Sequence, residues 1–285
     1  MAIEINKPEP LKIGTHYHYT LSSYEPVSIT ITVPTVTDAD VEFALESIAH
    51  EHGTTGDKVD DAWVQENLGA PSLDALKKSL HSQLEHMNSQ YAEESKAPLA
   101  ARELALRLNQ SVPVDEIAKY RNQLQQSMAF EAAQQGIDLS HYLAQLGVNQ
   151  ASMDAMLDDR AAQTAGEQAA LSAYAEEKKL KVVEDELPRL LQLTKEDAEK
   201  VVEQARGLGQ LDDLMSDARN VKAANVAASE ATCTYAHETP EEAKVRSEQY
   251  HAMLEMMRQQ AQAQADESDE GDKPSPEDKG FKLVD

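Results

Sequence analysis

The sequence predicts a mainly α-helical protein, and both its composition and the spacing of its apolar residues lead to that fold class. Aromatic residues make up 5% of the 285 residues, beside 11 Gly and 11 Pro. Such a composition disfavours a β-sandwich or barrel. Most of the chain carries apolar residues three or four positions apart, the spacing of one face of a helix. Only a region near the N-terminus alternates as a β-strand does.

That N-terminal region is expected to form a small β element. Residues 16–21 and 27–33 are rich in β-branched and aromatic residues, and their side chains alternate between two faces. Pro26 and Pro34 bracket the second run, as expected for a strand with defined ends.

Helix signals follow the strands. Thr37 can cap a helix, with Asp40 in the capping-box position, and residues 53–56 read as a linker after it. From Asp60 onward the pattern is helical. One long apolar stripe comprises Leu73, Leu76, Leu80, Leu84, Met87 and Tyr91. Pro98 is expected to break or kink that helix. Later helices are expected to begin near Pro113, Asn149, Thr194 and Thr239, with stops at Gly136, Gly147 and Gly207.

Three regions are expected along the chain. Residues 1–56 hold the strands and a linker helix, and residues 57–259 form a helical domain. Residues 260–285 contain the charge run 266–272 followed by Pro274 and Pro276, which cannot bury a core. We expect this last region to be a disordered tail.

The net charge of the chain limits the kinds of molecule that it is expected to bind. The formal net charge is −25 and the pI is about 4.6, which repels phosphate backbones and anionic lipid. Nucleic acid and membranes are therefore not expected as partners. Cys233 is the single cysteine, so no disulfide can form within the chain. The first ten residues do not resemble a signal peptide, so a cytoplasmic protein is expected.

No catalytic, cofactor or metal site is expected. His16 and His18 lie on one face of a possible strand, but no third metal ligand is evident near them. Adjacent carboxylates such as Asp60 and Asp61 do not face each other on a helix and are poor acid/base pairs. Residues 53–58 have the wrong spacing for a phosphate-binding loop. The sequence therefore predicts a protein that is not an enzyme.

Methionines are the candidate binding residues. Methionine is flexible and polarizable, so a surface rich in it can adapt to unlike apolar partners. The alternative is that these methionines are ordinary core residues. The six candidates for a peptide-binding surface are Met128, Met153, Met156, Met253, Met256 and Met257.

Several short motifs, in order, resemble the trigger factor family. Residues 36–41 resemble the segment that follows the family's linker strands, and residues 59–64 and 72–77 resemble the entry into its helical domain. Residues 112–114 resemble its Val-Pro helix start, and residues 215–234 its closing helix. The resemblance covers most of the chain between the second predicted strand and the tail.

This resemblance implies an elongated, multi-helix chaperone body with arms, similar to the C-terminal module of trigger factor and to SurA. It implies an ATP-independent chaperone that binds unfolded or nascent polypeptides in a helical cradle. The family's ribosome-docking Phe-Arg-x-Gly loop is absent, and only a few residues lie between Gly53 and Val59, where the family inserts an FKBP-like isomerase domain. Prolyl-isomerase activity and standard ribosome docking are therefore not expected.

Three alternatives stay open. The same helical cradle could serve a dedicated assembly factor or scaffold that binds one folded partner. A residual prolyl isomerase and a periplasmic SurA-like chaperone are the other two, disfavoured by the missing isomerase pocket and the missing signal peptide. The sequence leaves the clients and the oligomeric state open.

Overall fold

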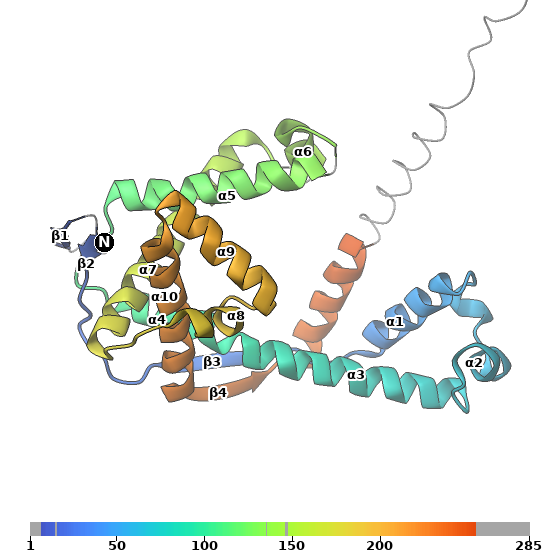
Figure 1. Cartoon of the computed structure of the whole chain (residues 1–285). Helices are drawn as coiled ribbons and strands as arrows, with labels where there is room; N and C mark the ends of the chain where they lie inside the picture. Colours follow the sequence, from blue (N-terminus) through green and yellow to red (C-terminus); the bar gives the residue numbers. More distant parts are fainter. Residues whose placement is uncertain (1–6, 15, 135, 146–147, 255–285) are drawn as a thin grey trace, which may run out of the picture. The chain divides into compact units, whose positions relative to one another are not determined.

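The computed structural model describes residues 7–14, 16–134, 136–145 and 148–254 (Figure 1). It divides into two compact units, each built from two stretches of chain. The larger unit comprises residues 1–31 and 93–235, and the smaller unit comprises residues 32–92 and 236–285. The predicted tail, residues 260–285, lies outside the described residues, and the domain boundaries at residues 56 and 259 stay predictions.

The smaller unit contains three α-helices before the chain enters the larger one. They are α1 (Asp38–Glu51), α2 (Asp61–Leu68) and α3 (Leu73–Glu94), with the short 3-10 helix η1 (Gly56–Lys58) between the first two. A further helical segment spans residues 240–254. The predicted cap of α1 is confirmed, because the Thr37 hydroxyl accepts from the Asp40 N–H while the Asp40 carboxylate accepts from the Thr37 N–H.

The core of the smaller unit is made by apolar side chains of α1, α2 and α3 and of the connection that precedes α2. Its buried members are Val41, Leu45, Ala49, Val59, Val64 and Leu80. The long stripe predicted for α3 lies on one helix, as expected, but it is not buried along its length. Leu80 is buried there, whereas Met87 and Tyr91 are 60% and 65% exposed.

A polar network joins α1 to the helical segment 240–254 inside the smaller unit. Ser247 Oγ donates to Asp40 Oδ1 at 2.7 Å, and Arg246 Nη2 lies 3.6 Å from Asp40 Oδ2. Burial alone would raise the pKa of the Asp40 carboxyl. Hydrogen bonds from Ser247 and Thr37, together with the Arg246 charge, outweigh burial and lower that pKa below its usual 3.8.

Replacing Asp40 with asparagine should therefore destabilise the smaller unit by about 1–3 kcal/mol at neutral pH, since hydrogen bonds to a buried charge are lost. A lowered folded pKa means that the Asp40 contribution is complete above the unfolded value of 3.8 and disappears as pH falls through the folded value. The difference between wild type and Asp40→Asn should thus vanish at low pH. Trp63, the single tryptophan, reports unfolding of this unit by fluorescence. A difference that stays constant down to low pH would contradict this assignment.

The larger unit begins with a small hairpin. Strands β1 (Leu11–Ile13) and β2 (His16–His18) pair antiparallel, with Lys12 opposite Tyr17. The second predicted strand is confirmed as β3 (Ser28–Val33), in which Ile29 and Ile31 are buried on one face.

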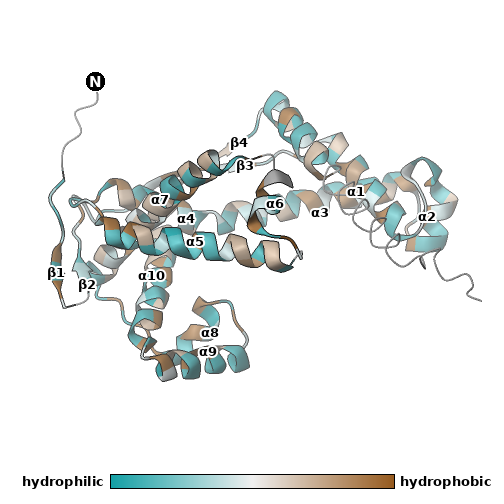
Figure 2. Cartoon of the chain, turned by 90° about the horizontal axis from the view of Figure 1, so that it is seen from above, coloured by the Kyte–Doolittle hydropathy of each residue, from teal (hydrophilic) through white to brown (hydrophobic). Residues whose placement is uncertain are grey.

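The helices of the larger unit follow in sequence after α3. They are α4 (Lys96–Leu106), α5 (Val114–Gln134), α6 (Leu139–Gln145), α7 (Gln150–Glu177), α8 (Leu187–Leu190), α9 (Lys195–Leu208) and α10 (Leu211–Glu230), with the 3-10 helix η2 (Glu184–Glu186) before α8. Helices α5 and α7 lie side by side, and α4, α7 and α10 pack against one another (Figures 1 and 2). A mainly α fold is confirmed.

Alanine lets the central helices approach closely. α7, α4 and α10 have mixed apolar and polar surfaces, and their buried positions are mostly small (Figure 2). Tyr174 on α7 is the largest of the fully buried side chains, at 1% exposure, and its hydroxyl donates to Glu230 Oε2 at 2.8 Å. The buried alanines of these three helices are Ala100, Ala101, Ala161, Ala165, Ala169, Ala170, Ala173, Ala175, Ala218, Ala223 and Ala227.

The segment that resembles the family's closing helix, residues 215–234, is not helical throughout. Helix α10 stops at Glu230, and residues Thr232–His237 form strand β4, which pairs with β3. The Thr232 N–H donates to the Val27 carbonyl and the Glu238 N–H to the Val33 carbonyl, so the two strands run in the same direction. The β-branched and aromatic residues after Ala231 suit a strand better than a helix.

Two predicted helix boundaries also move. Gly207 lies inside α9, and Gly209 ends that helix in the left-handed conformation, at φ 71°. Pro98 interrupts the helical run as predicted, but the break itself falls at Ser95. Helix α3 ends at Glu94, four residues before Pro98, whose ring would clash with the Glu94 carbonyl in a continuous helix, and Pro98 lies in the first turn of α4. Within the described residues, no helix has the length and apolar character needed to cross a membrane.

Candidate functional site

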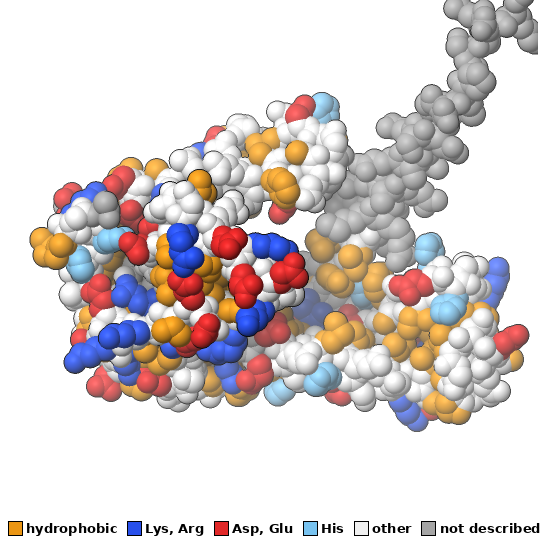
Figure 3. All heavy atoms as spheres, in the orientation of Figure 1, with side chains coloured by type: hydrophobic (Ala, Val, Ile, Leu, Met, Phe, Trp, Pro, Cys, Tyr) orange, Lys and Arg blue, Asp and Glu red, His pale blue; other side chains and the backbone are white. Residues whose placement is uncertain are grey.

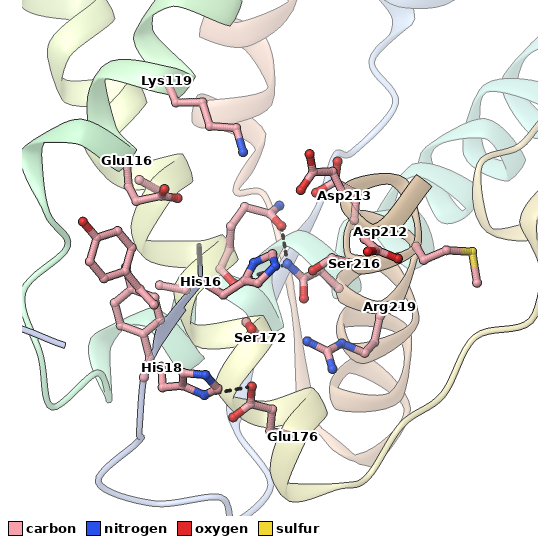
Figure 4. Close-up of a pocket in the computed structure, with 18 of the residues that line it drawn as sticks. His16, His18, Glu116, Lys119, Ser172, Glu176, Asp212, Asp213, Ser216 and Arg219 are labelled. Atoms are coloured by element: carbon pink, nitrogen blue, oxygen red, sulfur yellow. Dashed lines mark hydrogen bonds and ion pairs between the residues drawn. The ribbon is translucent and has the colours of Figure 1, made fainter. Parts of the chain in front are cut away.

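The larger unit contains an open cavity of about 610 Å³. Strand β2 and Tyr19 line one side of it, the first half of α5 and the middle of α7 line two others, and the start of α10 completes it (Figure 4). All the lining residues belong to the larger unit.

Side-chain and main-chain hydrogen bonds hold the β2 wall in place. The Tyr17 hydroxyl donates to Asp115 Oδ2 at 2.8 Å, and Lys12 Nζ donates to that hydroxyl at 3.0 Å. Beyond the strand, the Asn109 N–H donates to the Thr20 carbonyl at 3.0 Å. These bonds join the hairpin to the start of α5 and to the segment that precedes it, so the β2 side of the cavity is fixed by the fold.

Carboxylates outnumber cations around the cavity. The acidic side chains that line it are Glu116, Glu176, Asp212, Asp213 and Asp217. The cationic ones are Lys119, Lys181 and Arg219. Lys119 reaches from α5 toward Asp213 on α10, and His18 pairs with Glu176, with 3.4 Å between Nδ1 and Oε1 (Figure 4).

Burial within the protein shifts the pKa values of three side chains in the cavity wall. Burial raises the pKa of Tyr120 to about 12, and burial also raises the pKa of Tyr19. Desolvation raises the pKa of the Asp217 carboxyl, Asp213 adds to the rise, and Lys119 opposes it. Asp217 remains partly open to solvent, so it is available to a ligand.

Two polar atoms on α10 are buried and have no hydrogen-bond partner among the described residues. They are Arg219 Nε, a donor, and Asn220 Oδ1, an acceptor. Asn220 is 6% exposed, and its Nδ2 group already donates to Gln168 Oε1 at 2.9 Å. Gln168, Arg219 and Asn220 all line the cavity. Arg219 Nε and Asn220 Oδ1 are both enclosed by the protein and are therefore not open to the cavity in this structure.

This arrangement is suited to recognition. It offers tyrosine rings and an excess of negative charge around an open volume. His16 and His18 both line the cavity, but no group of three or more His, Cys, Asp or Glu side chains among the described residues could hold a metal ion.

The candidate methionines lie in different surroundings. Met153 is buried at 5% exposure in a cluster with Leu143 and Leu157, and Met128 packs against that cluster. Met156 and Met253 are exposed, at 59% and 42%. Met256 and Met257 lie outside the described residues. Met156, in the larger unit, and Met253, in the smaller unit, are therefore the two candidates that the structure shows to be exposed, while Met153 supports the fold.

Other exposed apolar side chains were not among the sequence candidates. Phe130 on α5 is 65% exposed, and hydrophobic side chains gather on the visible surface near the end of α5 and α6 (Figure 3). Phe130 falls outside the apolar stripe of its own helix, which runs through Tyr120, Leu124 and Met128. A phenylalanine out of register with the buried face was the signal that could have identified it. The stretch of chain from α4 to α9 contains further large apolar residues that are exposed, namely Leu106, Val114, Val183 and Leu208.

Comparison with known proteins supports one family. No curated protein matches the chain. The family model described as the bacterial trigger factor protein (TF) C-terminus matches residues 72–229, more than half of the 285 residues. The match begins at the start of α3 and ends within the last turn of α10. The predicted resemblance is therefore confirmed, and the chain belongs to the trigger factor family, a family of chaperone type.

Proposed function

We propose that this protein is an ATP-independent chaperone that holds unfolded or nascent polypeptides on apolar side chains exposed along its helices. The observation that carries the proposal is the family match from α3 to α10, in helices that leave large apolar side chains exposed. Proteins of this family bind unfolded polypeptides in general.

The exposed apolar residues suit weak, repeated contact. Phe130 on α5 and Met156 on α7 present large side chains to solvent on helices that are themselves held by a core. Each such contact is weak, and several together hold an extended client while still allowing release without nucleotide. The net charge of −25 helps to keep a loaded complex soluble.

We further propose that the protein acts in the cytoplasm, without prolyl-isomerase activity and without the family's standard ribosome docking. Helices α1 and α2 are joined by residues 52–60, which contain only the short 3-10 helix η1. An isomerase domain needs several strands and an aromatic pocket, and this connection supplies neither. The single cysteine fits a reducing compartment.

Replacing Phe130 and Met156 together with serine should weaken client holding by about three- to tenfold, because apolar contact area is lost. The thermal midpoint should hardly change, since both side chains are already exposed. The assay measures how an equimolar amount of protein, without ATP, slows aggregation of a chemically unfolded, unrelated protein. The matched control replaces Gln123 and Ala155, exposed on the same two helices, with serine.

The outcomes separate the proposal from its main rival. Slower aggregation by the wild type and the control, and a weaker effect of the double variant, support the chaperone function. If the wild type holds no unfolded client but purifies with one folded partner, a dedicated assembly factor or scaffold replaces it.

A further inference from the structure

The helical segment 240–254 turns a polar side toward the smaller unit and an apolar side toward solvent. Arg246 is half-buried on the side that contacts α1, and Ser247 is buried there, at 1% exposure. Three large apolar side chains of the segment are exposed, namely Val245, Tyr250 and Met253, at 49%, 50% and 42%. Surface helices usually have the opposite arrangement, because burial of an apolar face is what stabilises them. The segment is therefore attached to the smaller unit in an unusual way.

Hydrogen bonds and ion pairs hold the segment in place. Arg246 Nε donates to Glu238 Oε2 at 2.9 Å, and Arg246 Nη2 donates to the Thr35 carbonyl at 2.9 Å. Ser247 and Arg246 also contact the Asp40 carboxylate of α1. All five residues belong to the smaller unit, so the attachment lies within that unit. Such contacts depend on exact geometry and are lost together when the segment moves away.

Apolar packing adds little to this attachment. Among the described residues, no member of the unit's apolar core lies in the segment. Ala243 is buried at 0% exposure, but its side chain is a single methyl group. The His251 ring stacks on Phe43 of α1, with 4.5 Å between the ring centroids. Since an isolated helix of about 12–15 residues is only marginally stable in water, a segment of this length without a buried apolar face opens at a low free energy.

We propose that segment 240–254 is a strap that opens and recloses while α1, α2 and α3 stay folded, and that its opening uncovers the Phe43 ring. Phe43 is the aromatic side chain of α1 that the segment covers with His251. The closed strap limits the apolar surface that the smaller unit offers, and the open strap enlarges it. The movement stays within the smaller unit, and it does not require that the protein hold unfolded clients.

Hydrogen exchange of the full chain, followed by mass spectrometry, tests the strap. Amides of the segment should exchange at least about tenfold faster than those at the buried positions Val41, Leu45 and Ala49 of α1. Urea below the unfolding transition should hardly change the exchange of the segment, because opening of the strap exposes little surface. It should strongly accelerate exchange in α1, which opens only when the unit unfolds. Equal rates with an equal dependence on urea would overturn the proposal.

A variant of the strap tests which contacts keep it closed. Arg246→Met removes the guanidinium group and keeps most of the aliphatic stem. Exchange of the segment should become about tenfold faster, because the charge-assisted hydrogen bonds to Glu238 and Thr35 are lost. The matched control is Lys244→Met, which makes the same change of charge on the outer side of the same segment, where Lys244 pairs with Glu248 at 3.8 Å. It should exchange as the wild type does, and equal acceleration by both variants would contradict the proposed attachment.

Fluorescence of the apolar dye bis-ANS reports whether the opening uncovers apolar surface. Arg246→Met should raise the dye signal about twofold over Lys244→Met, and the further change Phe43→Ser should remove that excess. Trp63 fluorescence shows on the same samples that the smaller unit remains folded. If the segment exchanges faster in Arg246→Met but the dye signal equals that of the control, opening does not uncover Phe43 and the proposal is overturned.

Discussion

Replacement of Tyr174 with alanine is expected to destabilise the larger unit by about 3–5 kcal/mol, the range for truncating a fully buried aromatic side chain. Tyr174 is 1% exposed on α7, so truncating it to alanine would leave a cavity in the core. Its hydroxyl also donates to Glu230 Oε2, and Lys178 Nζ lies 5.3 Å from its ring centroid. The alanine variant loses packing and the connection to the end of α10 together.

The measurement is urea unfolding followed by far-ultraviolet circular dichroism, with hydrogen exchange of the α7 amides to locate the effect. Tyr174→Phe is the matched control, because it keeps the ring and removes only the hydroxyl, at a cost of about 0.5–1.5 kcal/mol. An alanine variant as stable as the phenylalanine variant would show that Tyr174 does not anchor this core.

Enlarging a buried alanine should produce the second large loss of stability. Ala170 on α7 is 0% exposed, and α7 packs against both α4 and α10. A leucine there has to push the helices apart or take a strained rotamer, which costs about 1–3 kcal/mol. Urea unfolding and hydrogen exchange of the α7 amides measure this loss as well.

Ala162→Leu provides the comparison, because Ala162 is exposed on the same helix. Its free energy of unfolding should stay within about 0.5 kcal/mol of the wild type. Equal stability of the two leucine variants would contradict close packing through alanine.

Local chemistry made most of the helices predictable. Thr37, Asn149 and Thr194 each cap a helix as expected, because a side-chain oxygen accepts from an N–H three residues later wherever such a residue precedes an apolar repeat. Strand β3 was predictable for a similar reason, since its buried face alternates with a polar one. These signals lie within a few residues of the elements they specify.

Features that depend on residues far apart in the sequence were not predicted from it. Strand β4 exists because it pairs with β3, which lies about two hundred positions earlier in the chain and is invisible to a local pattern. Gly207 and Gly209 are equally good helix stops in sequence, and only the backbone shows that Gly209 adopts the left-handed conformation. Met153 and Met156 are three positions apart, yet one is 5% and the other 59% exposed.

The cavity could not be predicted for the same reason. Four separated segments form it, and none carries a recognised motif. Asp212 and Asp213 look like a solvated helix start in sequence, and Asn220 looks like an ordinary polar residue on α10. Only the folded arrangement of β2, α5 and α7 around them shows that they line one cavity.

Binding of one protein in its unfolded and native forms tests whether the chain is a chaperone for unfolded polypeptides. A permanently unfolded client, such as a reduced and carboxymethylated disulfide protein, is titrated against the full chain by calorimetry without nucleotide, beside the native form of the same protein. We expect binding of the unfolded form with a negative heat-capacity change, the mark of apolar burial, and no binding of the native form. Failure to bind the unfolded form, or equal binding of both forms, would contradict it.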